Sequence, residues 1–146
     1  MHLDRVVCRR RLGAADHGVL CTVHAQRGVD AVPVCFVVDG DAIAVPIDQV
    51  KAKRTTELQR SHNLAADTRA TLLIERWDAD DWSHLWWVRA SLRHLDRSAV
   101  ADRTRDRLSE MLRQKYVQYR QAVFADLLVF DVVSLTGWSA TEETEV

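Results

Sequence analysis

The sequence is poor in the glycine patterns that bind phosphate groups. It holds five glycines in 146 residues, and none of them falls in a GxGxxG or a GxxxxGK[ST] pattern. In those patterns the glycines let the backbone come close to the phosphates of a dinucleotide or a nucleoside triphosphate. A Rossmann-type dinucleotide fingerprint and a P-loop are therefore excluded.

Long apolar runs and a strong excess of one charge are also missing. No stretch approaches the roughly 18 apolar residues that can span a bilayer. The first residues, MHLDRVVCRRRL, lack the apolar core of a signal peptide. The net charge of −1 argues against a general nucleic-acid-binding protein, which is usually strongly basic. We expect a cytoplasmic protein with no membrane or nucleic-acid partner.

Cysteine and the common catalytic motifs are scarce as well. Cys8, Cys21 and Cys35 are odd in number and form no CxxC pair, so they predict reduced core residues. The sequence contains no GxSxG and no HExxH. The acidic turn at residues 78–84 lacks the glycine and the distal glutamate of a calcium loop. We therefore predict no metal site, and no catalytic residue is identified.

The patterns that are present indicate a single β-rich domain over residues 1–146, of which 47% are hydrophobic. Period-two alternation and β-rich runs predict six strands, at residues 18–26, 31–38, 41–47, 69–77, 84–95 and 126–138. Amphipathic segments predict helices at residues 3–15, within 49–67, and at 99–123. Strands joined mostly by hairpins, with flanking helices, favour a mainly β fold built as a six-stranded antiparallel barrel.

A basic segment is the best candidate for an anion site. Lys51, Lys53 and Arg54 place three cations within four residues, and Thr55 follows them at a junction between a strand and a helix. A helix start adds free backbone N–H groups and the positive end of its dipole, which favour a phosphate. A solvated basic loop explains the same spacing equally well.

Three of the five tryptophans lie close together in residues 80–90, DDWSHLWWVRA. On a strand, Trp86 and Trp87 face opposite sides, so one can fill the barrel while the other covers a ligand or a second subunit. A purely structural role in the core and in a dimer interface accounts for them as well.

Two segments carry a resemblance to a known family. The words VKAKRT and DWSHLWWVR, within residues 47–78 and 80–90, resemble the actinobacterial branch of the pyridoxamine 5'-phosphate oxidase-like family, the flavin/deazaflavin oxidoreductases that use coenzyme F420. The resemblance extends over residues 11–138. The sequence departs from the family pattern at Ala52 and Thr68, where proline is common.

The resemblance implies a split β-barrel that forms a homodimer with two cofactor sites at the subunit interface. The cofactor phosphate would lie against the loop that matches Lys51, Lys53, Arg54 and Thr55. The cofactor ring would lie along strands that match Pro33, Val45, Pro46 and Ile47, and Trp87 would help to close the site.

The sequence is thus interpreted as an oxidoreductase that binds F420 and transfers hydride to or from a small organic substrate. FMN in the same fold is the nearest alternative, because both cofactors present a ring and a phosphate. A non-catalytic protein that binds or carries a flavin or deazaflavin is an alternative of another class. A structural dimer without a ligand also stays open.

Overall fold

The structure, a computed structural model, describes residues 1–48 and 59–142. Across these residues the chain forms seven strands, three α-helices and three short 3-10 helices. The strands are β1 (Gly18–His24), β2 (Gly28–Val34), β3 (Val37–Asp39), β4 (Ala42–Asp48), β5 (Arg69–Arg76), β6 (Trp86–Leu95) and β7 (Phe124–Ser139). The helices are α1 (Arg5–Ala14), α2 (Gln59–Ala66), α3 (Asp102–Lys115), η1 (Trp82–His84), η2 (Arg97–Ala99) and η3 (Val117–Tyr119).

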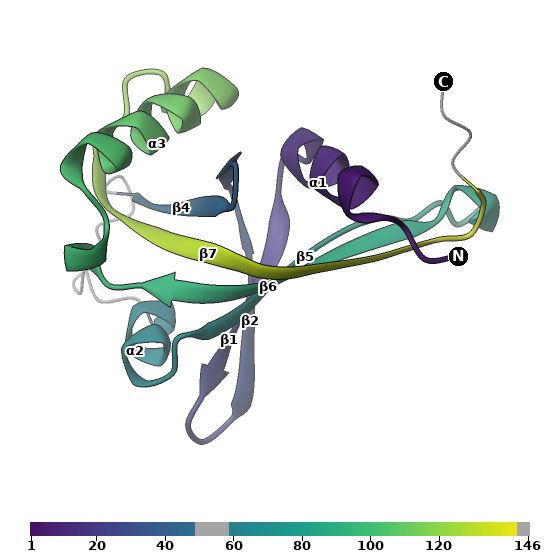
Figure 1. The fold of residues 1–146 in the computed structure, drawn as a ribbon, viewed down its shortest axis with the longest axis horizontal. Helices are drawn as coiled ribbons and strands as arrows, with labels where there is room; N and C mark the ends of the chain where they lie inside the picture. The colour runs from purple at the N-terminus through teal and green to yellow at the C-terminus, as the bar shows by residue number, and fades with distance from the viewer. Residues whose placement is uncertain (49–58, 143–146) are drawn as a thin grey trace.

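All of these strands belong to one antiparallel sheet in the order β2-β1-β5-β6-β7-β4-β3. Three hairpins supply the pairs β1–β2, β3–β4 and β5–β6, and β7 lies between β6 and β4. The sheet bends strongly, and its two edge strands, β2 and β3, follow each other in the chain (Figure 1). The predicted mainly β, antiparallel architecture with flanking helices is confirmed.

The predicted number of six strands is wrong, because the segment at residues 31–38 is two strands. β2 ends at Val34 and pairs with β1, whereas β3 begins at Val37 and pairs with β4. Phe36 between them is fully buried. Its N–H donates to the Tyr116 hydroxyl (3.1 Å), and its carbonyl accepts from the Lys115 ammonium (2.9 Å). Because side chains satisfy this backbone, the chain can change from one strand partner to another.

The predicted helix at residues 99–123 is shorter in the structure. α3 ends at Lys115, and Tyr116 takes extended backbone angles, with φ −113° and ψ 118°. The Tyr116 hydroxyl also donates to the Asp16 carbonyl (2.7 Å). These tertiary contacts of Tyr116 override the helix propensity of the residues that follow it.

The predicted helix at residues 3–15 is confirmed as α1. Asp4 caps it, since its carboxylate accepts from the Val7 N–H (2.9 Å). α1 buries Cys8 and Leu12 in the main core of the barrel, while a second cluster lies under α3 and includes Leu108 and Leu112.

The start of the chain packs along the end of β7. The Leu3 N–H donates to the Gly137 carbonyl (3.0 Å), and His2 forms an isolated antiparallel β-bridge with Trp138. A Cβ added at Gly137 would lie 2.7 Å from the Cys8 sulfur, closer than real Cβ contacts. The distal part of the β5–β6 hairpin and the end of β7 extend away from the barrel beside these first residues (Figure 1).

The cysteines are all free thiols, but they do not share one environment. Cys8 is buried, as predicted for a core residue, whereas Cys21 and Cys35 are only half-buried. None of the helices within residues 1–48 and 59–142 is long and apolar enough to cross a membrane. The cytoplasmic location stays a prediction.

Candidate functional site

The basic segment that carries the predicted phosphate ligands lies outside the described residues. Lys51, Lys53, Arg54 and Thr55 all fall in this gap, so their assignment stays a prediction. The described chain stops at the end of β4 and resumes at Gln59, the first residue of α2. The candidate site is therefore built from the surroundings of α2.

A pocket of about 280 Å³ lies between the start of α2 and the β1–β2 hairpin; we call it the α2 pocket. Its lining residues come from β1, β2, their turn and α2, and are Thr22, Arg27, Asp30, Ala31, Val32, Gln59 and Arg60. Most of its polar groups are already bonded to one another, which makes the pocket a preformed structure.

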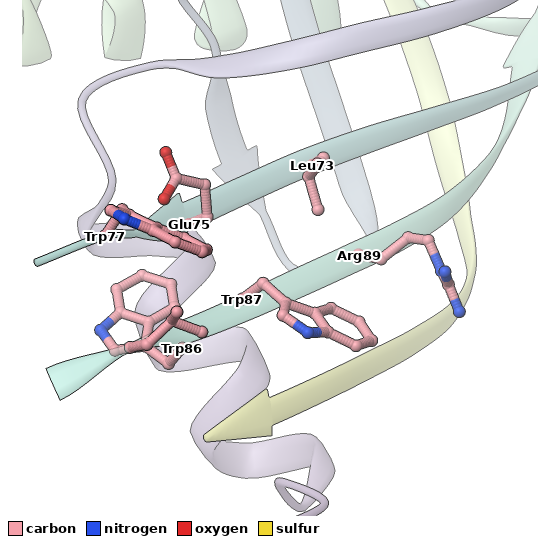
Figure 2. Close-up of a pocket in the computed structure, with 7 residues that line it drawn as sticks. Leu73, Glu75, Trp77, Trp86, Trp87 and Arg89 are labelled. Atoms are coloured by element: carbon pink, nitrogen blue, oxygen red, sulfur yellow. The ribbon is translucent and has the colours of Figure 1, made fainter. Parts of the chain in front are cut away.

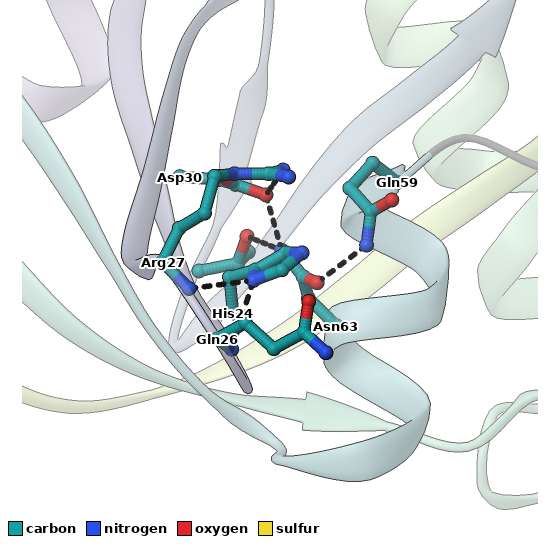
Figure 3. A network of polar contacts seen from close by, with 7 residues as sticks. His24, Gln26, Arg27, Asp30, Gln59 and Asn63 are labelled. Carbon is teal, nitrogen blue, oxygen red and sulfur yellow. Dashed lines mark hydrogen bonds and ion pairs between the residues drawn. The ribbon is translucent and has the colours of Figure 1, made fainter.

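Asn63 is the centre of this polar network (Figure 3). Its side-chain amide donates to the Thr22 hydroxyl and to an Asp30 carboxylate oxygen, both at 2.9 Å. Its amide oxygen accepts from the Gln59 side chain (3.0 Å). Asn63 is only 4% exposed and Thr22 2%, so these bonds satisfy polar groups that water does not reach. The network holds α2 against the β1–β2 hairpin.

The turn between β1 and β2 is stabilised by side-chain contacts in the same region (Figure 3). The Arg27 guanidinium pairs with both carboxylate oxygens of Asp30, at 3.0 and 2.9 Å. Hydrogen bonds from Arg27 and Asn63 hold the pKa of Asp30 below its usual value. His24 accepts at Nδ1 from the Gln26 and Arg27 N–H groups, at 3.0 and 2.9 Å. Asp30 is thus an ionised, partnered carboxylate.

Arg60 is the group in the α2 pocket that the network leaves unused. Its Nε is buried and has no hydrogen-bond partner in the described part of the chain. Burial lowers the pKa of Arg60, which reflects the cost of keeping the charged group away from water. An anion in the pocket would offset that cost, since a guanidinium pairs with phosphate or carboxylate through two parallel N–H bonds.

The strand residues predicted to contact the cofactor ring have different environments. Pro33 is exposed on the outward side of β2, and Ile47 on β4 is half-buried. Val45 is 1% exposed and belongs to the main core, and Pro46 is buried as well. The surfaces of Pro33 and Ile47 are therefore the ones a ligand could reach, and the assignment of all four stays a prediction.

A second pocket, of about 480 Å³, lies at the distal end of the β5–β6 hairpin; we call it the tryptophan pocket (Figure 2). It is lined by Leu73, Glu75, Trp77, Leu85, Trp86, Trp87 and Arg89. Trp86 and Trp87 face opposite sides of β6, as predicted: Trp86 packs against the barrel core, while Trp87 lies on the outward side. The Arg11 guanidinium of α1 covers Trp86 at 4.4 Å from the ring centroid.

Trp87 and the strand residues of β4 lie far apart within one protomer. Trp87 pairs with Trp138 at the end of β7, whereas Ile47 pairs with Asp126 at its start. At about 3.4 Å per residue, roughly 40 Å of strand separates them. Trp87 and Ile47 thus lie at opposite ends of β7.

Sequence reasoning missed Arg60, Asn63 and Asp30. Asn63 stands beside the apolar Leu64 in a helix whose side-chain pattern predicts only the apolar positions to be buried, so its burial has no sequence signal. Arg60 follows the basic segment and could have been added to it. Among the described residues, no group of three or more His, Cys, Asp or Glu side chains could hold a metal ion.

Comparisons with known proteins show the fold. No family model matches the sequence, and no curated protein matches it either. A conserved hypothetical protein from Mycobacterium tuberculosis superposes with a TM-score of 0.70 at 13% identity, over 99% of this chain and 92% of that one. An FAD-binding protein from Mesorhizobium loti gives 0.66 at 13%, over 94% and 95%. An FMN-binding protein from Syntrophomonas wolfei gives 0.62 at 15%, over 88% and 80%.

The chain shares the split-barrel fold of these structures. At these identities the similarity shows a shared fold and no more. The predicted split β-barrel is thereby confirmed, apart from its strand number.

Proposed function

We propose that the protein is an oxidoreductase that binds a flavin-type cofactor and transfers hydride between it and a small organic substrate. The observation that carries the proposal is the fold, which is shared over 94% of the chain with a protein named for FAD binding. We propose coenzyme F420 as the cofactor because residues 47–78 and 80–90 resemble the deazaflavin-using family. The ring would supply the electron chemistry, and the chain would bind it, orient it and exclude water.

The α2 pocket supports this proposal as the place for the anionic end of the cofactor. Arg60 offers a buried guanidinium nitrogen without a partner among the described residues. The volume of about 280 Å³ is below the 300–1,000 Å³ usual for pockets that enclose a whole ligand. The α2 pocket therefore fits a phosphate end, while the ring would lie outside it, towards the exposed Pro33.

FMN is the second candidate, favoured by the likeness to the FMN-binding protein from Syntrophomonas wolfei. Both cofactors carry a phosphate and a planar ring, so Arg60 would serve either of them. The choice between them depends on contacts with the ring, which the α2 pocket does not include.

We propose that a homodimer completes the site. The outward sides of β1 and β2 carry the apolar residues Val19, Cys21, Val23, Val29, Ala31 and Pro33, all of them exposed or half-buried. Val29 is 64% exposed. A contiguous apolar surface of this kind is typical of a contact with another protein. A second copy on this face would cover Pro33 and exclude water from the proposed ring position.

The test is a titration of the protein with F420 and with FMN, followed by tryptophan fluorescence. Arg60→Gln should weaken binding about tenfold or more, because a hydrogen bond to a charged group contributes about 1.5–3 kcal/mol. Arg103→Gln, an exposed arginine on α3, is the matched control and should leave the affinity unchanged. If neither cofactor binds, the proposal is wrong.

Two further measurements separate the parts of the proposal. Tight binding without turnover against any electron donor would make the protein a carrier instead of an enzyme. Light scattering should give twice the mass of the 16.7 kDa chain, and a monomer would refute the dimer.

A further inference from the structure

The tryptophan pocket has the size and lining of a ligand site, and Trp87 is the one lining residue that the predicted cofactor site shares with it. Its volume of about 480 Å³ lies within the range of pockets that hold small organic molecules. Three tryptophans and two leucines are among the seven residues that line it. Trp77 is 65% exposed, which is a large apolar surface to leave in water.

The positions of the rings favour a flat ligand. Trp77 and Trp86 stand at the end of the hairpin, and Trp87 lies further along β6, so the pocket is open along the outward side of the two strands (Figure 2). Aromatic rings prefer offset-stacked or edge-to-face contacts with other rings, which contribute beyond the apolar area that they bury. A planar aromatic group is the shape that can lie flat against the Trp87 indole on the outward side.

Two charged side chains of the pocket have no ion-pair partner within the part of the chain that the structure describes, namely Arg89 and Glu75. The Arg89 guanidinium carbon lies 5.2 Å from the centroid of the Trp87 ring. The guanidinium thus covers one face of Trp87. Its N–H donors therefore lie beside the ring surface, where they can reach an acidic substituent of a ligand on Trp87.

The negative charge of Glu75 favours one kind of anion over another. Glu75 is directly across from Trp87, and Arg89 is across from the neighbouring Leu73. Glu75 and Arg89 are thus diagonal neighbours, with a backbone separation of about 7–8 Å. A carboxylate at this distance repels a doubly charged phosphate more strongly than a singly charged acid. A singly charged carboxylate is therefore the better match.

We propose that the tryptophan pocket binds a planar aromatic carboxylate, whose ring lies against Trp87 and whose carboxylate pairs with Arg89. Glu75 lies where it can accept a hydrogen bond from an N–H or O–H group elsewhere on the ring. This site does not depend on the cofactor proposed above.

The test uses 2-naphthoate and its neutral amide, 2-naphthamide, as probes without any flavin present. Calorimetry measures the affinities, and the indole N–H signals in NMR spectra report where the probes bind. The acid should bind at least tenfold more tightly than the amide, and the Trp87 indole signal, assigned through Trp87→Phe, should shift. Arg89→Gln should abolish the preference for the acid.

Arg93→Gln is the matched control, since Arg93 lies on the same strand, outside the pocket, and pairs with Asp131 (3.3 Å). This variant should bind both probes as the unmodified protein does. Equal affinity of acid and amide, an unaffected Arg89→Gln variant, or no shift of the Trp87 signal would each overturn the proposal. So would a dimer that Arg89→Glu converts into monomers, because the pocket would then be a contact between two copies.

Discussion

Replacement of Asn63 by alanine should destabilise the protein, because the amide bridges α2 and β1 in a place without water. Asn63 donates to the Thr22 hydroxyl at 2.9 Å, and the two residues are 4% and 2% exposed. In Asn63→Ala this hydroxyl keeps no partner among the described residues. An unsatisfied buried polar group costs about 1–3 kcal/mol, and the space left by the side chain adds to this. We expect the free energy of unfolding to fall by about 2–4 kcal/mol.

Urea unfolding followed by tryptophan fluorescence measures this loss. With a slope of about 2 kcal/mol per M, the midpoint should fall by about 1–2 M. Gln59→Ala removes only an exposed donor to Asn63 and should cost about 0.5–1 kcal/mol. Thr22→Val should recover about 1 kcal/mol in the Asn63→Ala background, since it removes the orphaned hydroxyl. The reasoning fails if Asn63→Ala costs under about 0.5 kcal/mol, or if Thr22→Val has the same effect in both backgrounds.

Three further perturbations test other parts of the structure. Burial raises the pKa of Tyr116 to about 12, so its neutral form contributes stability that is lost as the pH rises from about 10 to 12. In a pH titration of tyrosinate absorbance, Tyr116→Phe should remove the step at the higher pH. An unchanged titration would contradict the assignment of that step to Tyr116. Burial lowers the pKa of His94. The neutral imidazole therefore contributes stability that is present above about pH 6.5 and is lost as the pH falls through the lower pKa of the folded state. NMR titration of the imidazole should give a midpoint below 6.5, and a midpoint at or above 6.5 would refute the assignment. Gly137→Ala should lower the free energy of unfolding by about 1–3 kcal/mol, because the new Cβ would contact the Cys8 sulfur. Gly13→Ala in α1 has open space around it and should raise the free energy of unfolding by about 0.5–1 kcal/mol. Thermal unfolding compares the two variants, and equal effects would contradict the packing at β7.

The parts of the fold that depend on local periodicity could be predicted from the sequence. Alternation along β1 puts Leu20 inside and Val19 outside, and the Asp39-Gly40 turn joins β3 to β4. The break at Phe36 could not be predicted, because its cause is a pair of side chains about 80 positions away. A β-rich run reads as one strand until the partner of each half is known.

The candidate site, too, has a part that could be predicted from the sequence and a part that could not. Charge and spacing point to the basic segment at residues 51–55, because anion binding depends on local residue types. The burial of Asn63 and the unused Nε of Arg60 result from tertiary packing of α2, which no local pattern records. The opposite orientations of Trp86 and Trp87 follow from strand geometry and could be predicted, whereas the pocket beside them could not.

The position of β7 in the sheet has a consequence for how the newly made chain folds. β7 comes after all the other described strands along the chain, yet it lies between β6 and β4 and joins the β2-β1-β5-β6 group to the β4-β3 hairpin. Even the terminal amine of Met1 bonds to the carbonyl of Ser139, 138 positions along the chain. Until residues 124–139 leave the ribosome, β6 and β4 have open edges that can pair with other chains. The nascent protein should therefore be most prone to aggregation until residues 124–139 have left the ribosome, and a chaperone would be needed most at that stage.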